Sequence, residues 1–217
     1  MSYSRANPSP RYLELQALYR SLHAQGESLL GIQPEDQYPG NSLMPQVHRI
    51  KALVDRTGAQ TVLDYGSGKG RQYDAVPLRD AAGNEYPGVL DYWNVDEVRC
   101  FDPGYPPYSK YPEENFDGVI CTDVLEHCPE EDIPWILEEL FGFASRFVFA
   151  NVASYPALQR LPNGENAHCT IKPTAWWRDL FERAAARHAG VRWEVWIASM
   201  ADTQSGRKLV EEKIAGD

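Results

Sequence analysis

The run TVLDYGSGKG at 61–70 joins the end of an apolar segment to one carboxylate and three alternate glycines. Its apolar residues are typical of a buried parallel strand, and Asp64 follows them directly. Gly66, Gly68 and Gly70 come next, and glycine permits a positive φ and a close approach of the backbone to a ligand. The run therefore predicts a site for a nucleotide moiety, with a ligand-free turn between a strand and a helix as the alternative.

The spacing of the glycines distinguishes a dinucleotide-binding site from other nucleotide sites. A dinucleotide fingerprint needs G-x-G-x-x-G, with an acidic residue about twenty positions further on. Here Arg71 stands where the third glycine would be, and the carboxylate of Asp64 precedes the first glycine. In that place Asp64 can accept hydrogen bonds from an amino group of a ligand, or it can hold the loop. The pattern is not that of a dinucleotide site.

Two further predicted strands end in carboxylates. Asp102 follows a short strand at 98–101, and the segment Asp123-Val-Leu-Glu126-His127 follows a strand at 116–122. In a parallel sheet, ligands bind at the carboxyl ends of the strands. We therefore expect these groups to lie beside the glycine loop, although Asp102 before a proline could merely begin a turn.

The elements that must position these groups alternate along the chain. Apolar spacing predicts a helix from Ser9 and Pro10, which we expect to pack as an accessory element, and a second helix capped by Asn41 or Ser42. Helices are expected to begin at Pro129 and to run from 173 to about 188. A strand is expected at 146–152, and a hairpin-like pair of strands at 192–199 and 207–214. This order predicts an α/β fold with three layers, whose doubly wound sheet is mostly parallel with an antiparallel edge strand.

Length and composition agree with one domain over 1–217, with N-terminal helices in 1–57 and an insertion at 77–94. The net charge of −10 should repel phosphate backbones, so nucleic acid is a disfavoured partner. The sequence offers neither an apolar run of about twenty residues nor the apolar core of a signal peptide, which predicts a cytoplasmic protein without a membrane partner. The spacing of the four cysteines favours reduced thiols.

The pattern D-x-G-x-G-x-G at 64–70 and the stretch FDGVICTDVLEH at 116–127 resemble class I S-adenosylmethionine-dependent methyltransferases. The resemblance spans roughly residues 40–200 and implies a Rossmann-like methyltransferase sheet with S-adenosyl-L-methionine as cofactor. It also implies that the glycines contact the methionine and ribose portions and that Asp102 receives both ribose hydroxyls. The cofactor-binding residues predicted in this way are Asp64, Gly66, Ser67, Gly68, Gly70, Asp102, Thr122, Asp123 and Leu125.

One departure from the family affects the adenine. In the family a helix and a strand usually separate the ribose-binding acid from the next strand, whereas here only the stretch 104–115 lies between them. The adenine contact is therefore left open. Tyr105, Tyr108 and the backbone near Cys121 and Thr122 are the candidates, and ordinary loop packing explains the tyrosines equally well.

The acceptor chemistry points to two histidines. A hydroxyl acceptor must lose its proton as it attacks, whereas a neutral amine can attack first. His168 lies in a loop after the 146–152 strand and is our first choice as base, while His127 precedes a helix whose dipole keeps an imidazole neutral. With Glu126 beside them, they predict O-methylation of a small molecule or glycan, although each histidine could simply be packed.

Two alternatives stay open. Asp123, Glu126, His127 and His168 resemble the E-x-x-E-H plus histidine set that holds a divalent cation in small-RNA 2′-O-methyltransferases, but an aspartate replaces the first glutamate and the charge opposes RNA. A divalent cation is thus possible but less favoured than a free base. A non-catalytic subunit that binds an S-adenosyl ligand is the other alternative, and it would not need the histidines.

Overall fold

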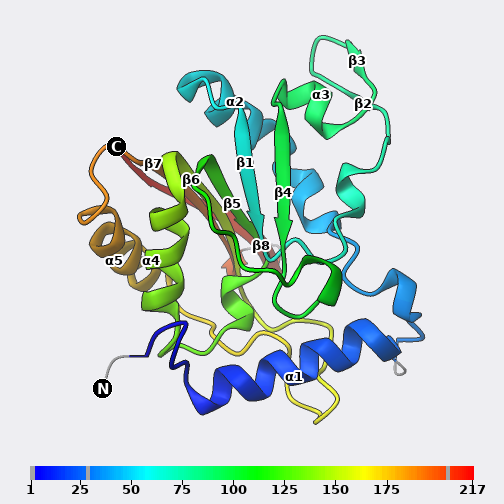
Figure 1. Cartoon of the computed structure of the whole chain (residues 1–217). Helices are drawn as coiled ribbons and strands as arrows, with labels where there is room; N and C mark the ends of the chain where they lie inside the picture. Colours follow the sequence, from blue (N-terminus) through cyan, green and yellow to red (C-terminus); the bar gives the residue numbers. More distant parts are fainter. Residues whose placement is uncertain (1–2, 28–29, 204–205) are drawn as a thin grey trace.

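The computed structural model describes residues 3–27, 30–203 and 206–217. A six-stranded sheet in the order β4-β1-β5-β6-β7-β8 forms the centre, and helices lie on both of its faces (Figure 1). The strands of this sheet are β1 (Thr61–Tyr65), β4 (Glu97–Phe101), β5 (Phe116–Thr122), β6 (Ala144–Ser154), β7 (Arg192–Thr203) and β8 (Gly206–Gly216). The helices are α1 (Pro10–Gln25), α2 (Val47–Thr57), α3 (Val89–Trp93), α4 (Ile133–Phe143) and α5 (Thr174–Ala185).

The pairing of the strands confirms the predicted fold class. β1 pairs in parallel with β4 and β5, and β5, β6 and β7 follow in parallel. β8 pairs antiparallel with β7 and forms the edge. Residues 204–205, between the two strands of the predicted hairpin-like pair, lie outside the described residues. Because parallel strands end at the same edge of a sheet, the carboxyl ends of β1, β4 and β5 meet.

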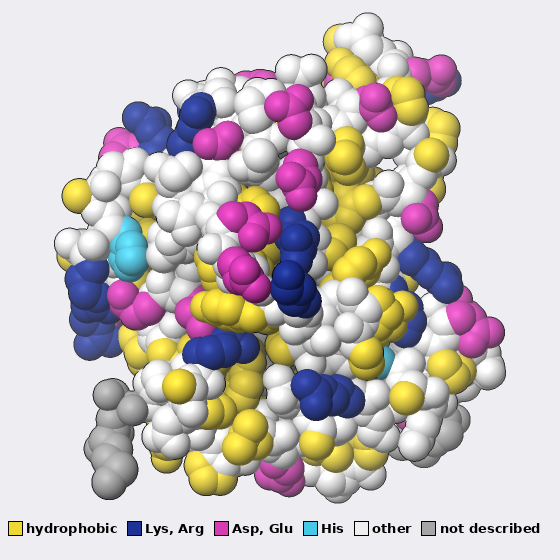
Figure 2. All heavy atoms as spheres, in the orientation of Figure 1, with side chains coloured by type: hydrophobic (Ala, Val, Ile, Leu, Met, Phe, Trp, Pro, Cys, Tyr) yellow, Lys and Arg dark blue, Asp and Glu magenta, His cyan; other side chains and the backbone are white. Residues whose placement is uncertain are grey.

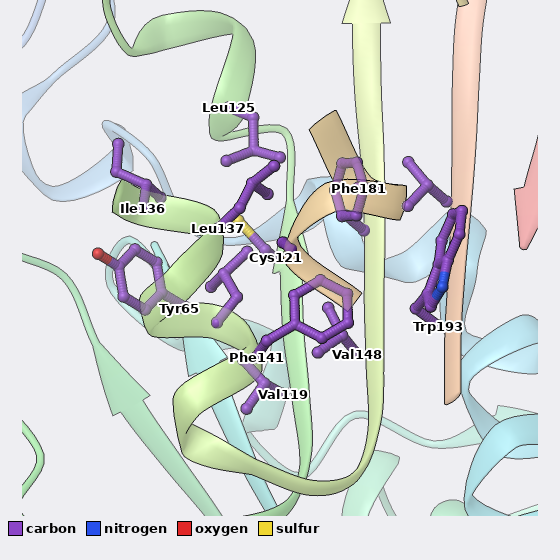
Figure 3. Close-up of a cluster of buried hydrophobic side chains, with 14 of the residues drawn as sticks. Tyr65, Val119, Cys121, Leu125, Ile136, Leu137, Phe141, Val148, Phe181 and Trp193 are labelled. Atoms are coloured by element: carbon purple, nitrogen blue, oxygen red, sulfur yellow. The ribbon is translucent and has the colours of Figure 1, made fainter. Parts of the chain in front are cut away.

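Apolar side chains fill the space between the sheet and the helices on each face. Figure 3 shows Phe141 of α4 and Phe181 of α5 pointing toward the sheet, with Val148 of β6 and Trp193 of β7 beside them. The rings of Phe181 and Trp193 stack with their centroids 5.8 Å apart. α2 and α3 cover the opposite face with a second apolar cluster. Burial on both faces explains the runs of apolar residues in the central strands β5 and β6.

Residues 77–94, expected as an insertion, contain the small antiparallel sheet of β2 (Leu78–Arg79) and β3 (Glu85–Tyr86), followed by α3. The indole of Trp93 at the end of α3 is fully buried, and its Nε1 donates to the carbonyl of Val47, 2.9 Å away. This bond ties the end of the segment to the start of α2.

Two helix starts differ from the sequence prediction. α2 begins at Val47 after a 3₁₀ turn at Asn41–Gln46, so neither Asn41 nor Ser42 caps it, and the Ser42 hydroxyl instead donates to Asp123. α4 begins at Ile133, not at Pro129, because residues 129–132 close a separate turn. In both places side-chain or turn contacts compete with the helix for the same residues.

α1 crosses the carboxyl ends of β1 and β4 (Figure 1). The hydroxyl of Ser9 caps the helix by accepting from the Tyr12 N–H, 3.0 Å away. Ser9 is also bound by its own N–H and hydroxyl to the carboxylate of Asp132, directly before α4. α1, which we expected to pack as an accessory element, is therefore fixed across the carboxyl ends of these strands.

On the face seen in Figure 2, basic side chains stand beside acidic ones and do not gather into one basic patch. All four cysteines are free thiols. Among the described residues, no helix combines the length and apolar character that a membrane crossing requires.

Candidate functional site

A cleft of about 580 Å³ lies at the carboxyl ends of β1, β4 and β5. α1 and the segment 36–42 form one side of it, and the strand ends form the other. The predicted site residues that line this cleft are Gly66, Ser67, Gly68, Asp102, Thr122, Asp123, His127 and His168. Those that lie behind its walls are Asp64, Gly70, Leu125 and Glu126. Most of the predicted cofactor residues and both histidines are thus brought to one cavity.

The backbone N–H groups of the glycine loop are all used inside the protein. Residues 66 and 67 donate to the carbonyl of Phe101, residue 68 donates to the Asp102 carboxylate, and residue 70 donates to the carbonyl of Ser67. Residues 69 and 71 donate to the carbonyls of Tyr38 and Pro39. A phosphate-binding loop needs such N–H groups free to point at the anion. This loop therefore suits a ligand without a phosphate at this place.

The glycines are required by close packing as well as by conformation. Gly68 has φ +58, and a Cβ there would lie 2.3 Å from the carbonyl oxygen of Tyr38. Gly66 has φ +86, and a Cβ there would lie 2.3 Å from a methyl group of Val124. The glycine loop is thus in close contact with the segment 36–42 and with the start of the 123–127 segment. These contacts hold the loop in place at the wall of the cleft.

Gly68→Ala is expected to lower the free energy of unfolding by about 2 to 4 kcal/mol, because the left-handed backbone and the contact with a carbonyl both penalise a methyl group. Gly164→Ala is the matched control, since Gly164 has φ +86 but nothing within 4 Å of its Cβ position. It should cost only about 1 to 2 kcal/mol. Urea unfolding followed by circular dichroism measures both, and equal losses would show that the Tyr38 contact adds nothing.

Asp64 holds the loop from behind. Its side chain is 1% exposed, and its Oδ2 accepts from Gln72 Nε2 and from the Tyr73 hydroxyl, both 2.8 Å away. Of the two roles that the sequence leaves open for Asp64, this placement supports the structural one. Burial raises the pKa of Asp64 to about 7, even though the two hydrogen bonds act to lower it.

Asp64 is expected to make the protein less stable as the pH rises from about 4 to about 7. Because the folded pKa lies above the ordinary value, the folded state keeps a proton that the unfolded chain has already released, so stability is lost as the pH rises through about 7. Asp64→Asn mimics the protonated form. It should therefore remove the change in the free energy of unfolding across this pH range, which is on the order of 3 kcal/mol. Urea unfolding at several pH values tests this, and an unchanged slope in Asp64→Asn would contradict it.

Asp102 lies directly after β4, and each of its carboxylate oxygens accepts a hydrogen bond from one backbone N–H. Oδ2 accepts from Gly68, 2.9 Å away, and Oδ1 accepts from Gly104, 2.7 Å away. Each oxygen keeps a second lone pair that can accept a ligand hydroxyl. Burial raises the pKa of Asp102 to about 6, so the carboxylate is mainly ionised at pH 7.

An aromatic group that the sequence analysis missed lies close to Asp102. His23 of α1 lines the cleft, stacks on Tyr105 with ring centroids 5.1 Å apart, and lies 5.1 Å from the ring of Tyr38. Burial, and to a lesser extent the charge of Lys69, lowers the pKa of His23 to about 4, so the ring is neutral. The apolar stripe of α1 was the only signal in the sequence, and it does not show which strand ends the helix covers.

His127 and His168 meet at the rim of the cleft, with ring centroids 4.7 Å apart. His127 Nδ1 lies 3.0 Å from the Ala167 carbonyl, and His168 Nδ1 lies 2.6 Å from the Tyr155 carbonyl. The Tyr19 hydroxyl also lies 2.7 Å from His127 Nδ1, and it donates its own proton to the Ala167 carbonyl, so it is an acceptor toward Nδ1. Because the partners of both Nδ1 atoms accept, each Nδ1 carries the proton and each Nε2 keeps a free lone pair. Burial lowers the pKa of His127 to about 4, although Asp123 acts to raise it.

Asp123 completes this rim cluster, which we define as Asp123, His127 and His168. Its backbone is in the left-handed region at φ +61, and its Oδ2 accepts from the Ser42 hydroxyl, 2.8 Å away. Burial acts to raise the pKa of Asp123, but the charge of His127 and the Ser42 bond outweigh it and lower the pKa. A non-glycine residue in this conformation is often found at functional sites.

Glu126 does not join the rim cluster. Its side chain is fully buried and accepts from the Ala153 N–H of β6. Burial, together with the nearby Asp123, raises its pKa well above the ordinary value. The placement gives Glu126 a structural contact behind the histidines and no access to an acceptor, which does not support the catalytic role predicted for it.

No protein-family model matches the chain, and no curated protein matches its sequence. Two solved structures are distantly similar. One is 1,6-didemethyltoxoflavin-N1-methyltransferase from Burkholderia thailandensis with bound 1,6-didemethyltoxoflavin and S-adenosylhomocysteine, at 16% identity over 94% of this chain and 74% of that chain, with a TM-score of 0.34. The other is a DhpI-SAH complex, at 14% identity over 94% and 79% of the two chains, with a TM-score of 0.28. These likenesses are too distant to assign a function, which must come from the cleft itself.

Proposed function

We propose that this protein is an S-adenosylmethionine-dependent methyltransferase that methylates a hydroxyl oxygen of a small molecule or glycan. The observation that carries the proposal is the pairing of Asp102 with the glycine loop at one strand edge. Asp102 offers lone pairs to two ribose hydroxyls, while the loop has no N–H left for a phosphate. An adenosyl ligand that carries a sulfonium in place of phosphates fits this combination.

Methyl transfer from a sulfonium depends more on the orientation of the reacting groups and on the exclusion of water than on acid assistance to the leaving group. As the acceptor oxygen forms its bond to the methyl carbon, the carbon–sulfur bond breaks, its electron pair returns to sulfur, and the positive charge disappears. α1 and the segment 36–42 line one side of the cleft and narrow its opening to bulk water. The hydroxyl proton goes to an imidazole of the rim cluster, where His168 Nε2 and His127 Nε2 are free to accept it.

The acceptor class follows from size and charge. A cleft of about 580 Å³ falls in the range typical of small-molecule sites, about 300 to 1,000 Å³. The net charge of −10 disfavours binding of a phosphate backbone, and the face seen in Figure 2 shows basic side chains beside acidic ones and no continuous basic track. Both features favour a small molecule or glycan over nucleic acid.

Calorimetry and isotope transfer test the proposal together. S-adenosylhomocysteine should bind with one site per chain, and NAD⁺ should not bind, because its pyrophosphate has no partner on the loop. The protein is then incubated with methyl-labelled S-adenosylmethionine and separate small-molecule, glycan and RNA fractions, and the labelled product is identified by mass spectrometry. Label in the small-molecule or glycan fraction is the expected result.

Each of the other outcomes would favour one of the alternative functions or contradict the proposal. Label confined to RNA would favour the RNA 2′-O-methyltransferase alternative. Tight binding of S-adenosylhomocysteine without transfer to any fraction would favour the non-catalytic binding subunit. Binding of NAD⁺ in preference to S-adenosylhomocysteine would overturn the proposal.

A further inference from the structure

The rim cluster has a geometry that a free base does not need. One ligand atom each from Asp123, His127 and His168 lies within 4.8 Å of the other two. Nitrogen ligands bind a first-row metal ion at about 2.1 Å, which places neighbouring ligand atoms about 3 to 3.4 Å apart. Small side-chain rotations would therefore bring all three atoms onto one ion.

The hydrogen bonds that these three side chains make on the side away from the proposed ion are of the kind that metal ligands make. A ligating histidine donates its other ring N–H to a carbonyl or carboxylate, which fixes the tautomer and directs the free nitrogen at the metal. His127 and His168 both do this through Nδ1, toward the carbonyls of Ala167 and Tyr155. Asp123 is likewise steadied by the Ser42 hydroxyl on Oδ2, which leaves Oδ1 available.

We propose that the rim cluster is a binding site for a divalent first-row transition-metal ion, held by His127 Nε2, His168 Nε2 and the Asp123 carboxylate. Two imidazoles and one carboxylate suit such ions better than Mg²⁺ or Ca²⁺, which prefer oxygen ligands. Glu126 is not a ligand, because its carboxylate is buried against β6. This set therefore differs from the four-residue set that the sequence resembles.

The site opens into the cleft that holds Gly66 and Thr122, so an ion here would have coordination positions left for an acceptor oxygen. With the ion bound, the Nε2 lone pairs of His127 and His168 are occupied, so the ion would replace the free imidazoles in activating the acceptor. A hydroxyl bound to such an ion loses its proton more readily. This role of the ion rests on the function proposed above, whereas binding of the ion does not.

Cobalt(II) is a suitable probe because its visible absorption reports nitrogen and oxygen ligation. Protein freed of metal by dialysis against a chelator should bind one equivalent of Co²⁺. Zn²⁺ should displace it, and a large excess of Mg²⁺ should not. His127→Ala and His168→Ala should each weaken binding by more than about 100-fold, since loss of even an outer contact costs about 10- to 100-fold. His48→Ala, which replaces a surface histidine on α2, should bind Co²⁺ like the parent.

Nuclear magnetic resonance of the parent protein with Co²⁺ avoids reliance on variants that fail to fold. Two exchangeable, strongly shifted signals are expected from the Nδ1–H groups of His127 and His168, which their carbonyl partners protect from solvent. Absence of saturable Co²⁺ binding, equal displacement by Mg²⁺, or equal weakening in His48→Ala would overturn the site. Since none of these measurements uses S-adenosylmethionine, the site can fail while methyl transfer stands, and the reverse.

Discussion

His168→Ala is expected to slow methyl transfer by about 10²- to 10⁴-fold, the usual effect of removing a general base, while the affinity for S-adenosylhomocysteine stays nearly unchanged. The reason is the position of His168 at the rim, where its Nε2 is free and its Nδ1 is held by the Tyr155 carbonyl. The imidazole acts on the acceptor and not on the adenosyl group. Single-turnover transfer to the acceptor that the isotope-transfer experiment identifies, with calorimetry of S-adenosylhomocysteine, measures the two effects separately.

His48→Ala is the matched control, because His48 lies on α2 with its Nδ1 on the Tyr92 hydroxyl, away from the cleft. It should turn over like the parent. Full turnover by both His168→Ala and His127→Ala would remove the base hypothesis and leave proximity alone. Loss of parent activity on chelation, restored by Zn²⁺ or Co²⁺, would instead identify His168 as a metal ligand and not a free base.

Asp102→Ala is expected to weaken S-adenosylhomocysteine binding by about 30- to 150-fold, or roughly 2 to 3 kcal/mol. The substitution removes the carboxylate that accepts both ribose hydroxyls and also frees the N–H groups of Gly68 and Gly104. Asp102→Asn keeps the side-chain size and one acceptor oxygen, so its loss should be smaller. Calorimetry on variants that circular dichroism shows to be folded gives both values.

Asp117→Ala separates the effect on the ligand from the effect on the fold. Asp117 also accepts from two backbone N–H groups, those of Gln60 and Thr61, but at the opposite end of β1. It should therefore lose stability without losing affinity. If Asp102→Ala binds S-adenosylhomocysteine as tightly as the parent, then the ribose assignment is wrong.

The sequence by itself determined the order of the strands and helices and the edge at which the site would form. Period-2 and continuous apolar runs are local signals, so the strands ending near Asp64, Asp102 and Thr122 were predicted within one or two residues of β1, β4 and β5. The parallel order then places these strand ends together without further information. For the same reason His127 and His168 could be predicted at one rim, since each follows a neighbouring strand.

Only the tertiary structure decided which way each side chain faces and what covers the cleft. Asp64 turns into the protein toward Gln72 and Tyr73. Glu126 also turns inward, and α1 forms a wall of the cleft, because hydrogen bonds join residues far apart in the chain. Ser9 binds Asp132, Ser42 binds Asp123, and the Tyr38 carbonyl binds the glycine loop. Such contacts have no period or spacing in the sequence. They form only when the packed sheet brings the partners within about 3 Å and burial makes an unpaired polar group costly.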